Sequence, residues 1–163
     1  MSEWQKILEA SPNRFVRGGY RELCRFGQTP ETIKKQFCAA APVFLATPYS
    51  EEVLVGGDWS QSRSRSQILA AQRESVRLTQ VGFTVISPIA TLGPLLHLPK
   101  PFGDLVLPDP LDPPAFRKWR APLLDVCRIV VVPDLPGSSY SRDILDCVSA
   151  AIRRNKLVYF YGS

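Results

Sequence analysis

The chain has 163 residues, of which 45% are apolar and 21% are charged. This length suits one domain with a small appendage, and the composition supports a packed core rather than a disordered chain. No stretch approaches the roughly 20 uncharged apolar residues of a membrane-spanning helix, and the first residues lack the apolar block of a secretory signal. We therefore expect a cytoplasmic protein with no membrane partner.

The charge and the metal-binding residue types exclude several further classes. The net charge is +5, but no block of five or more like charges occurs, so a nucleic-acid partner is not expected and an anionic small molecule is. The four cysteines form no CxxC pair and the chain has one histidine, which argues against a zinc site and a disulfide framework. The sequence indicates free, buried thiols, and no metal or cofactor is expected.

The segment before Pro42 has a helical pattern. Helices are expected over 3–10 and 14–26, and a third is expected after Thr29, which can cap it, with Pro30 at its first position. Residues 1–41 are therefore interpreted as a short helical N-terminal extension, which offers a surface for a protein partner.

Residues 42–163 alternate apolar runs with helical patterns. Strands are expected over 43–47, 83–87, 129–132 and 157–160, and helices over 61–81, 116–125 and 141–154. Eight prolines lie in 88–114, which is interpreted as one long irregular loop.

This alternation predicts a three-layer α/β domain with a parallel sheet buried on both faces. In such sheets, ligands bind beyond the carboxyl ends of the strands, near the point where the strand order reverses. Three segments follow strands and should converge there, namely 47–50, 87–89 and 133–146.

The same three segments resemble a known family. The strings FLATPYS at 44–50, GFTVISPI at 82–89 and DLPG at 134–137, with Ser141 opening a helix, are similar to the nucleoside 2-deoxyribosyltransferase-like family, most of all to its small uncharacterised bacterial and phage members. The resemblance covers about residues 43–161. It implies a flavodoxin-like or Rossmann-like sheet, a nucleoside or nucleotide ligand, and a homo-oligomer in which a neighbouring subunit completes the pocket.

The resemblance also implies a catalytic carboxylate. In the family, a glutamate in the helix after the third strand attacks C1′ of the sugar. Aligned on Ser141, the family's glycine position holds Asp143 and its glutamate position holds Cys147. A shift of one residue places Asp146 at the nucleophile position instead. Cys147 is then either a packed, inert thiol or a reactive group.

Further roles follow from position. Asp125 or Asp143 would assist proton transfer and Tyr49 would orient the sugar, although Asp125 also suits a solvated helix end and Tyr49 also suits packing under the long loop. Substrate contacts are expected from Ser50, Ser87, Pro88, His97, Trp119, Gly137, Ser139, Ser141 and Arg142.

Three of these residues have both a functional and a structural interpretation. The helix start at Ser141 favours a phosphate, or it is simply capped by that serine. His97 could act as a general acid over the site, or it could be structural. Trp119 could stack on a base, or it could pack in the core.

Two functions remain open from the sequence. One is an enzyme that cleaves or transfers the N-glycosidic bond of a nucleoside or nucleotide, as a transferase or a hydrolase. The other is a catalytically degenerate relative that binds a nucleotide-like ligand or a protein. The strand-end loops and carboxylates favour the first, and the missing glutamate and glycine favour the second.

Overall fold

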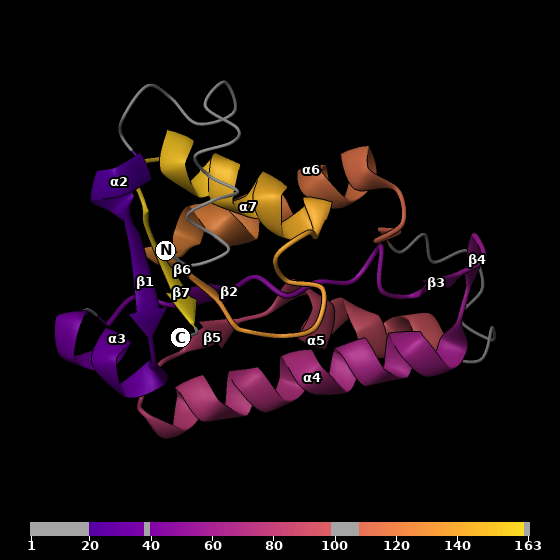
Figure 1. Ribbon diagram of the computed structural model, residues 1–163, viewed down its shortest axis with the longest axis horizontal. Coiled ribbons are helices and arrows are strands. Elements are labelled where there is room, and N and C mark those ends of the chain that lie inside the picture. The colour runs from indigo at the N-terminus through magenta and orange to yellow at the C-terminus, as the bar shows by residue number, and fades with distance from the viewer. Residues whose placement is uncertain (1–19, 38–39, 99–107, 162–163) are drawn as a thin grey trace.

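A parallel sheet forms the centre of the molecule (Figure 1). The computed structural model describes residues 20–37, 40–98 and 108–161. Every strand pair in the five-stranded sheet is parallel, and the strand order is β1-β7-β6-β2-β5. The strands are β1 (Cys24–Gln28), β2 (Val43–Leu45), β5 (Val85–Ile86), β6 (Ile129–Val132) and β7 (Leu157–Tyr161). A separate antiparallel pair, β3 (Leu54–Val55) and β4 (Asp58–Trp59), follows β2.

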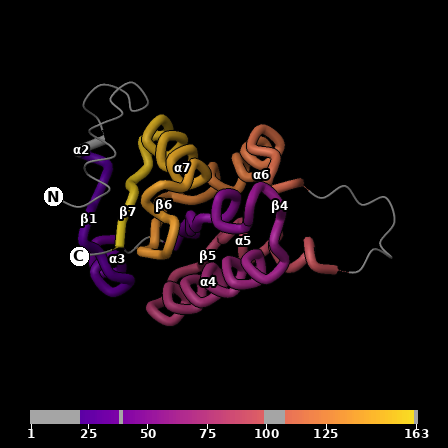
Figure 2. Tube along the Cα trace, turned by 45° about the vertical axis from the view of Figure 1, so that its right-hand side comes forward, coloured from indigo at the N-terminus to yellow at the C-terminus, as the bar shows by residue number. Residues whose placement is uncertain are grey.

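Helices cover both faces of the sheet and complete the predicted three-layer α/β architecture. They are α2 (Tyr20–Leu23), α3 (Pro30–Gln36), α4 (Gln61–Gln80), α5 (Pro88–Leu92), the 3-10 helix η1 (Gly93–His97), α6 (Pro113–Val126) and α7 (Arg142–Arg153). Figure 2 separates α6 and α7 from α4 on opposite sides of the sheet. None of the described helices combines the length and hydrophobicity needed to cross a bilayer.

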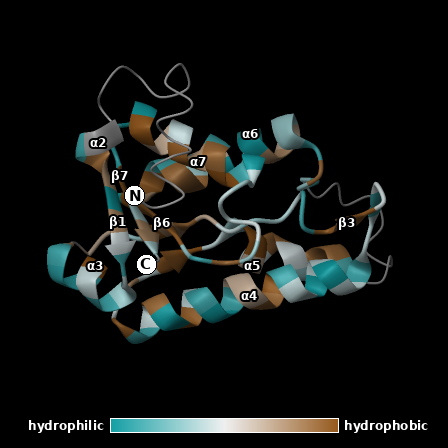
Figure 3. Cartoon of the chain, viewed as in Figure 1, coloured by the Kyte–Doolittle hydropathy of each residue, from teal (hydrophilic) through white to brown (hydrophobic). Residues whose placement is uncertain are grey.

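Alternating side chains of the strands supply the two core layers. Phe44, Val130 and Val132 pack with Ile144 of α7 and Leu124 of α6. The intervening strand residues pack in a second cluster on the other face, with side chains of α3 and α4. Figure 3 shows the resulting contrast between the hydrophobic central strands and the largely hydrophilic α4.

The segment before Pro42 is not entirely helical, which corrects the expectation for 14–26. Cys24–Gln28 form the edge strand β1, which pairs with β7, while α3 begins at Pro30 with Thr29 as its N-cap, as predicted. Phe26 stacks on Phe160 with ring centroids 4.9 Å apart. Residues 3–10 and 14–19 lie outside the described residues.

The proline-rich segment is also not one irregular loop. Ser87 caps α5, Pro88 is its first residue, and η1 follows directly. A Cβ on Gly93 would collide with the side chain of Ile68, so this glycine lets α5 and η1 lie against α4. The prolines therefore begin helices here, where a missing N–H has no consequence. Residues 99–107 lie outside the described part of the chain.

The strand order reverses between β2 and β6. From β2 the chain passes through α4 to β5 on one side, and from β6 it passes through α7 to β7 on the other. Loops that leave the carboxyl ends of β2 and β6 therefore diverge and leave a crevice between them.

Candidate functional site

A pocket of about 700 Å³ opens at this reversal, and we call it the switch-point pocket. It lies between the loop after β2, the start of α6 and the start of α7. Its volume is in the usual range for small-molecule sites. The lining residues are Ser50, Glu51, Leu54, Leu111, Pro113, Arg117, Tyr140, Arg142, Asp143 and Asp146.

Asp143 is the most buried acid of the pocket. It lies in the first turn of α7 and is 6% exposed. Its Oδ2 accepts hydrogen bonds from the backbone N–H of Ser50, at 3.2 Å, and from the Ser50 hydroxyl, at 2.5 Å. Burial raises the pKa of Asp143, although the Ser50 bonds and the charge of Arg120 act in the opposite direction. This carboxyl group therefore keeps its proton to a higher pH than an exposed aspartate does.

Glu51 lies beside Asp143 and shares a serine with it. The Ser50 hydroxyl is 2.5 Å from Asp143 Oδ2 and 3.0 Å from Glu51 Oε2. One hydroxyl has one proton, so it can donate to only one of the two carboxyl groups. The hydroxyl therefore lies between two carboxyl groups, and burial raises the pKa of one of them, Asp143.

Glu51 also occupies the start of α7. Its Oε1 accepts from the backbone N–H of Arg142 at 3.1 Å, and its Oε2 accepts from the Ser141 hydroxyl at 3.4 Å. Ser141 is the N-cap residue, but its side chain makes no capping hydrogen bond. The protein's own carboxylate therefore sits where the sequence predicted a phosphate, which corrects that expectation.

Asp146 faces the same pocket, as predicted, but it is paired. Its Oδ2 lies 2.9 Å from a guanidinium nitrogen of Arg117, and both side chains are partly exposed. The structure thus brings Asp143 and Asp146 together at one pocket. The positive charge of Arg117 offsets that of Asp146.

Tyr49 does not join these acids, contrary to expectation. It is fully buried, and its hydroxyl lies 2.7 Å from Ser64 Oγ of α4. Ser64 Oγ lies 2.9 Å from His97 Nε2, so a short hydrogen-bonded chain links the three side chains. Burial lowers the pKa of His97, which favours its neutral form. Tyr49 and Trp59 line a neighbouring hollow of about 320 Å³, and Leu111 lines both this hollow and the switch-point pocket.

Asp125 lies at the opposite end of the sheet from the pocket. It is in the last turn of α6, just before β6 begins, and its Oδ1 lies 2.5 Å from Arg154 Nε. Because α6 precedes a strand, its last turn lies at the amino end of that strand. The expected convergence of Asp125 with Tyr49 and Asp143 is therefore wrong, and its interpretation as a helix-end carboxylate agrees with the structure.

Several predicted contacts have structural partners instead. Trp119 stacks on Phe116, with ring centroids 5.8 Å apart. The Ser87 hydroxyl accepts from the Ala90 N–H as the cap of α5, and neither Ser87, Pro88 nor Ser139 lines the switch-point pocket.

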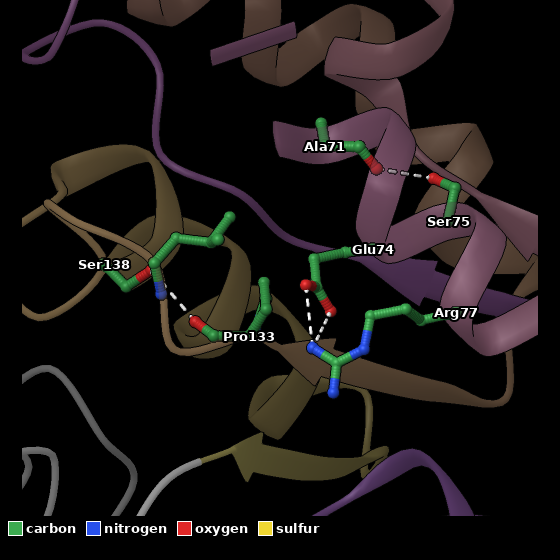
Figure 4. Close-up of polar contacts among 7 residues, drawn as sticks. Ala71, Glu74, Ser75, Arg77, Pro133 and Ser138 are labelled. Atoms are coloured by element: carbon green, nitrogen blue, oxygen red, sulfur yellow. Dashed lines mark hydrogen bonds and ion pairs between the residues drawn. The ribbon is translucent and has the colours of Figure 1, made fainter. Parts of the chain in front are cut away.

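The loop between β6 and α7 is fixed by its own hydrogen bonds. The Ser138 hydroxyl donates to the Pro133 carbonyl at 3.0 Å. Figure 4 draws this loop together with the ion pair of Glu74 and Arg77 on α4. Arg77 Nη1 and Glu74 Oε1 are 3.0 Å apart.

Cys147, at the family's glutamate position, lies in the core. It is 4% exposed, and burial raises the pKa of its thiol to about 11. A protonated thiol is a weak nucleophile, so the structure supports the packed, inert alternative. It touches a small cavity of about 10 Å³ that Thr47, Arg120 and Asp143 also line. Thr47 Oγ1 is buried there without a hydrogen-bond partner among the described residues.

Sequence reasoning missed Glu51, Glu52 and Arg117. The two glutamates directly follow the segment 47–50 that was selected as a strand-end loop. Two negative charges directly after a strand-end loop were the signal that could have identified them. Arg117 had no distinguishing signal, because solvated arginines are common on helices.

Gly137 permits the contact between the two loops. Its φ is +88°, and a Cβ there would collide with the carboxylate of Glu52, which accepts from the Tyr140 hydroxyl at 2.6 Å. We expect Gly137→Ala to lower the free energy of unfolding by about 1–2 kcal/mol for the left-handed backbone, and by more because Glu52 must move. Gly56 (φ +61°) has open space around it, so Gly56→Ala should show the backbone effect alone. Urea denaturation would measure both, and equal losses would contradict the contact argument.

The described residues contain no cluster of histidine, cysteine, aspartate or glutamate that could hold a metal ion. Residues 41–163 match the model of a family described as a domain of unknown function, DUF1937. No curated protein and no solved structure matches the chain. The matched range includes every residue that lines the switch-point pocket.

Proposed function

We propose that the chain, which belongs to the DUF1937 family, binds a nucleoside or nucleotide in the switch-point pocket and cleaves or transfers its N-glycosidic bond. The observation that carries this proposal is the Ser50 hydroxyl between Glu51 and the buried Asp143, whose pKa burial raises. An acid and a carboxylate at one pocket are the pair that this chemistry requires.

The reaction assigns one role to each acid. The bond between C1′ and the base nitrogen breaks, and its electron pair stays with the base. Asp143 donates its proton to the departing base, and its own charge is then stabilised by the backbone N–H of Ser50. Positive charge develops at C1′ of the sugar, where a carboxylate must face it. Water or a second base then adds to C1′ and gives up a proton, which returns to Asp143 and completes hydrolysis or transfer.

Glu51 is better suited than Asp146 to face C1′. Three donors orient Glu51, and none of them carries a full positive charge. Asp146 instead has Arg117 at 2.9 Å, which offsets its negative charge. The alternative is Asp146 as the nucleophile, which is the assignment from the family resemblance. It predicts that Asp146→Asn reduces base release more than Glu51→Gln does.

A second candidate function rests on Cys147. The side chain at the family's nucleophile position is a buried thiol, which favours a protein that binds a nucleotide-like ligand and performs no chemistry. A protein partner at residues 1–41 belongs to this alternative. Of that segment, residues 1–19 and 38–39 lie outside the described part of the chain.

Incubation with a panel of nucleosides and nucleotides tests the two functions. Chromatography should detect free base if the enzyme proposal is correct. A ligand that raises the melting temperature of the protein without releasing base would favour the binding protein. Neither release nor stabilisation with any member of the panel would overturn both nucleotide functions and would point to a protein partner.

A further inference from the structure

We propose that a second site, in the groove between α6 and α7, binds a phosphate group. Both helices lie side by side on one face of the sheet (Figures 1 and 2). A groove of about 320 Å³ runs between them, and four arginines line it. We call it the arginine groove, after Arg117, Arg120, Arg153 and Arg154.

Positive charge in the arginine groove exceeds negative charge. Asp146 is the one carboxylate among its lining residues, and it is paired with Arg117 at 2.9 Å. Arg154 is paired with Asp125, which lies outside the lining. Arg120 and Arg153 have no ion pair with any residue that the structure describes. The groove therefore presents two guanidinium groups that have no ion-pair partner in the described part of the chain.

Of the two arginines without an ion pair, Arg120 is the stronger indication of an anion site. It is 6% exposed, its guanidinium makes no hydrogen bond with a described residue, and its guanidinium carbon lies 5.2 Å from the ring centroid of Phe116. Its charge acts on Asp143 through space, but no ion pair joins them. Burying a cation without a hydrogen-bonded anion is strongly unfavourable. An anion in the groove would remove this penalty.

Phosphate is the anion that suits these groups. The planar guanidinium fork binds two phosphate oxygens at once, and two such forks match a dianion. The start of α7, where a phosphate would otherwise bind, is filled by Glu51. Arg117 and Asp146 line both the arginine groove and the switch-point pocket, so the two sites are contiguous. The phosphate could thus be part of a nucleotide in the pocket or a separate ion.

Calorimetry with inorganic phosphate, at ionic strength held constant with potassium chloride, tests the proposal. Arg153→Ala is the principal variant, because Arg153 is exposed and its replacement should leave folding intact. We expect the dissociation constant for phosphate to rise by about tenfold. Arg73→Ala, an exposed arginine on α4 across the sheet, is the matched control and should bind as the wild-type protein does. Arg120→Lys, with melting temperature recorded, tests the buried fork while keeping the charge.

The outcomes decide both the site and the source of the phosphate. No heat with the wild-type protein, or equal affinity in wild type and Arg153→Ala, would overturn the proposal. So would binding of short single-stranded DNA without binding of phosphate. A nucleoside 5′-monophosphate that binds more tightly than its nucleoside, with the gain lost in Arg153→Ala, would place the ligand's own phosphate in the groove. Independent, simultaneous binding of phosphate and nucleoside would identify a separate ion.

The groove and the proposed function can fail separately. Release of base from an unphosphorylated nucleoside should be unchanged in Arg153→Ala, because Arg153 does not line the switch-point pocket. Phosphate binding without any base release would retain the groove and reject the enzyme.

Discussion

Replacing Asp143 with asparagine should reduce the rate of base release by about 100- to 10,000-fold, the usual contribution of a general acid. Asparagine keeps the size of the side chain and can still accept from the Ser50 N–H, but it has no acidic proton for the departing base. The rate of release under saturating substrate measures the effect. Asp125→Asn changes an equivalent group at the opposite end of the sheet and should leave the rate unchanged.

The pH dependence gives an independent check on Asp143. Because burial raises its pKa, the acid form persists to higher pH than in an exposed aspartate, and release should fall as the pH rises through that pKa. The residual rate of Asp143→Asn should lack this fall. If the variant has the wild-type rate, Asp143 is not the acid, even if the chain proves to be an enzyme.

Replacing Phe44 with alanine should lower the free energy of unfolding by about 3–5 kcal/mol. Phe44 lies on the inner strand β2, is fully buried, and packs with residues of the neighbouring strands and of α6 and α7. The substitution removes buried apolar surface and leaves a cavity among the packed side chains, and both lower the free energy of unfolding. Urea denaturation monitored by circular dichroism would measure it.

Leu69→Ala is the control for this substitution. Leu69 lies on α4 and is 45% exposed, so its truncation should change the free energy of unfolding by less than about 0.5 kcal/mol. A loss at Phe44 as small as that would mean that β2 is not central to the core.

The fold was largely predictable, with the exceptions of its first strand, the β3–β4 pair, and α5 and η1. Ile129–Val132 form a run of branched apolar residues, which only a strand buried on both faces explains in so short a segment. Cys24–Gln28 have alternating burial, two polar residues and a glycine, because β1 is an edge strand that needs one apolar face. Five residues of such a pattern cannot be distinguished from part of an amphipathic helix.

The site was predictable only in part. Asp143 was found because it follows a strand and begins a helix, and this position determines its place in the fold. The direction of the Tyr49 side chain was not predictable, because strand alternation no longer applies after Pro48. The partnership of Glu51 with the start of α7 joins residues 91 positions apart, and no local pattern encodes it.

The contact between Ser50 and Asp143 spans 93 positions of the chain, and it closes the pocket wall. A contact of such sequence separation forms only after the intervening strands have been brought together, since loop closure opposes it until then. A polypeptide emerging from the ribosome consequently has no ligand site until α7 has been synthesised and docked. Ligand occupancy would therefore act as a reporter of completed folding, and it would give no help to a partly made chain.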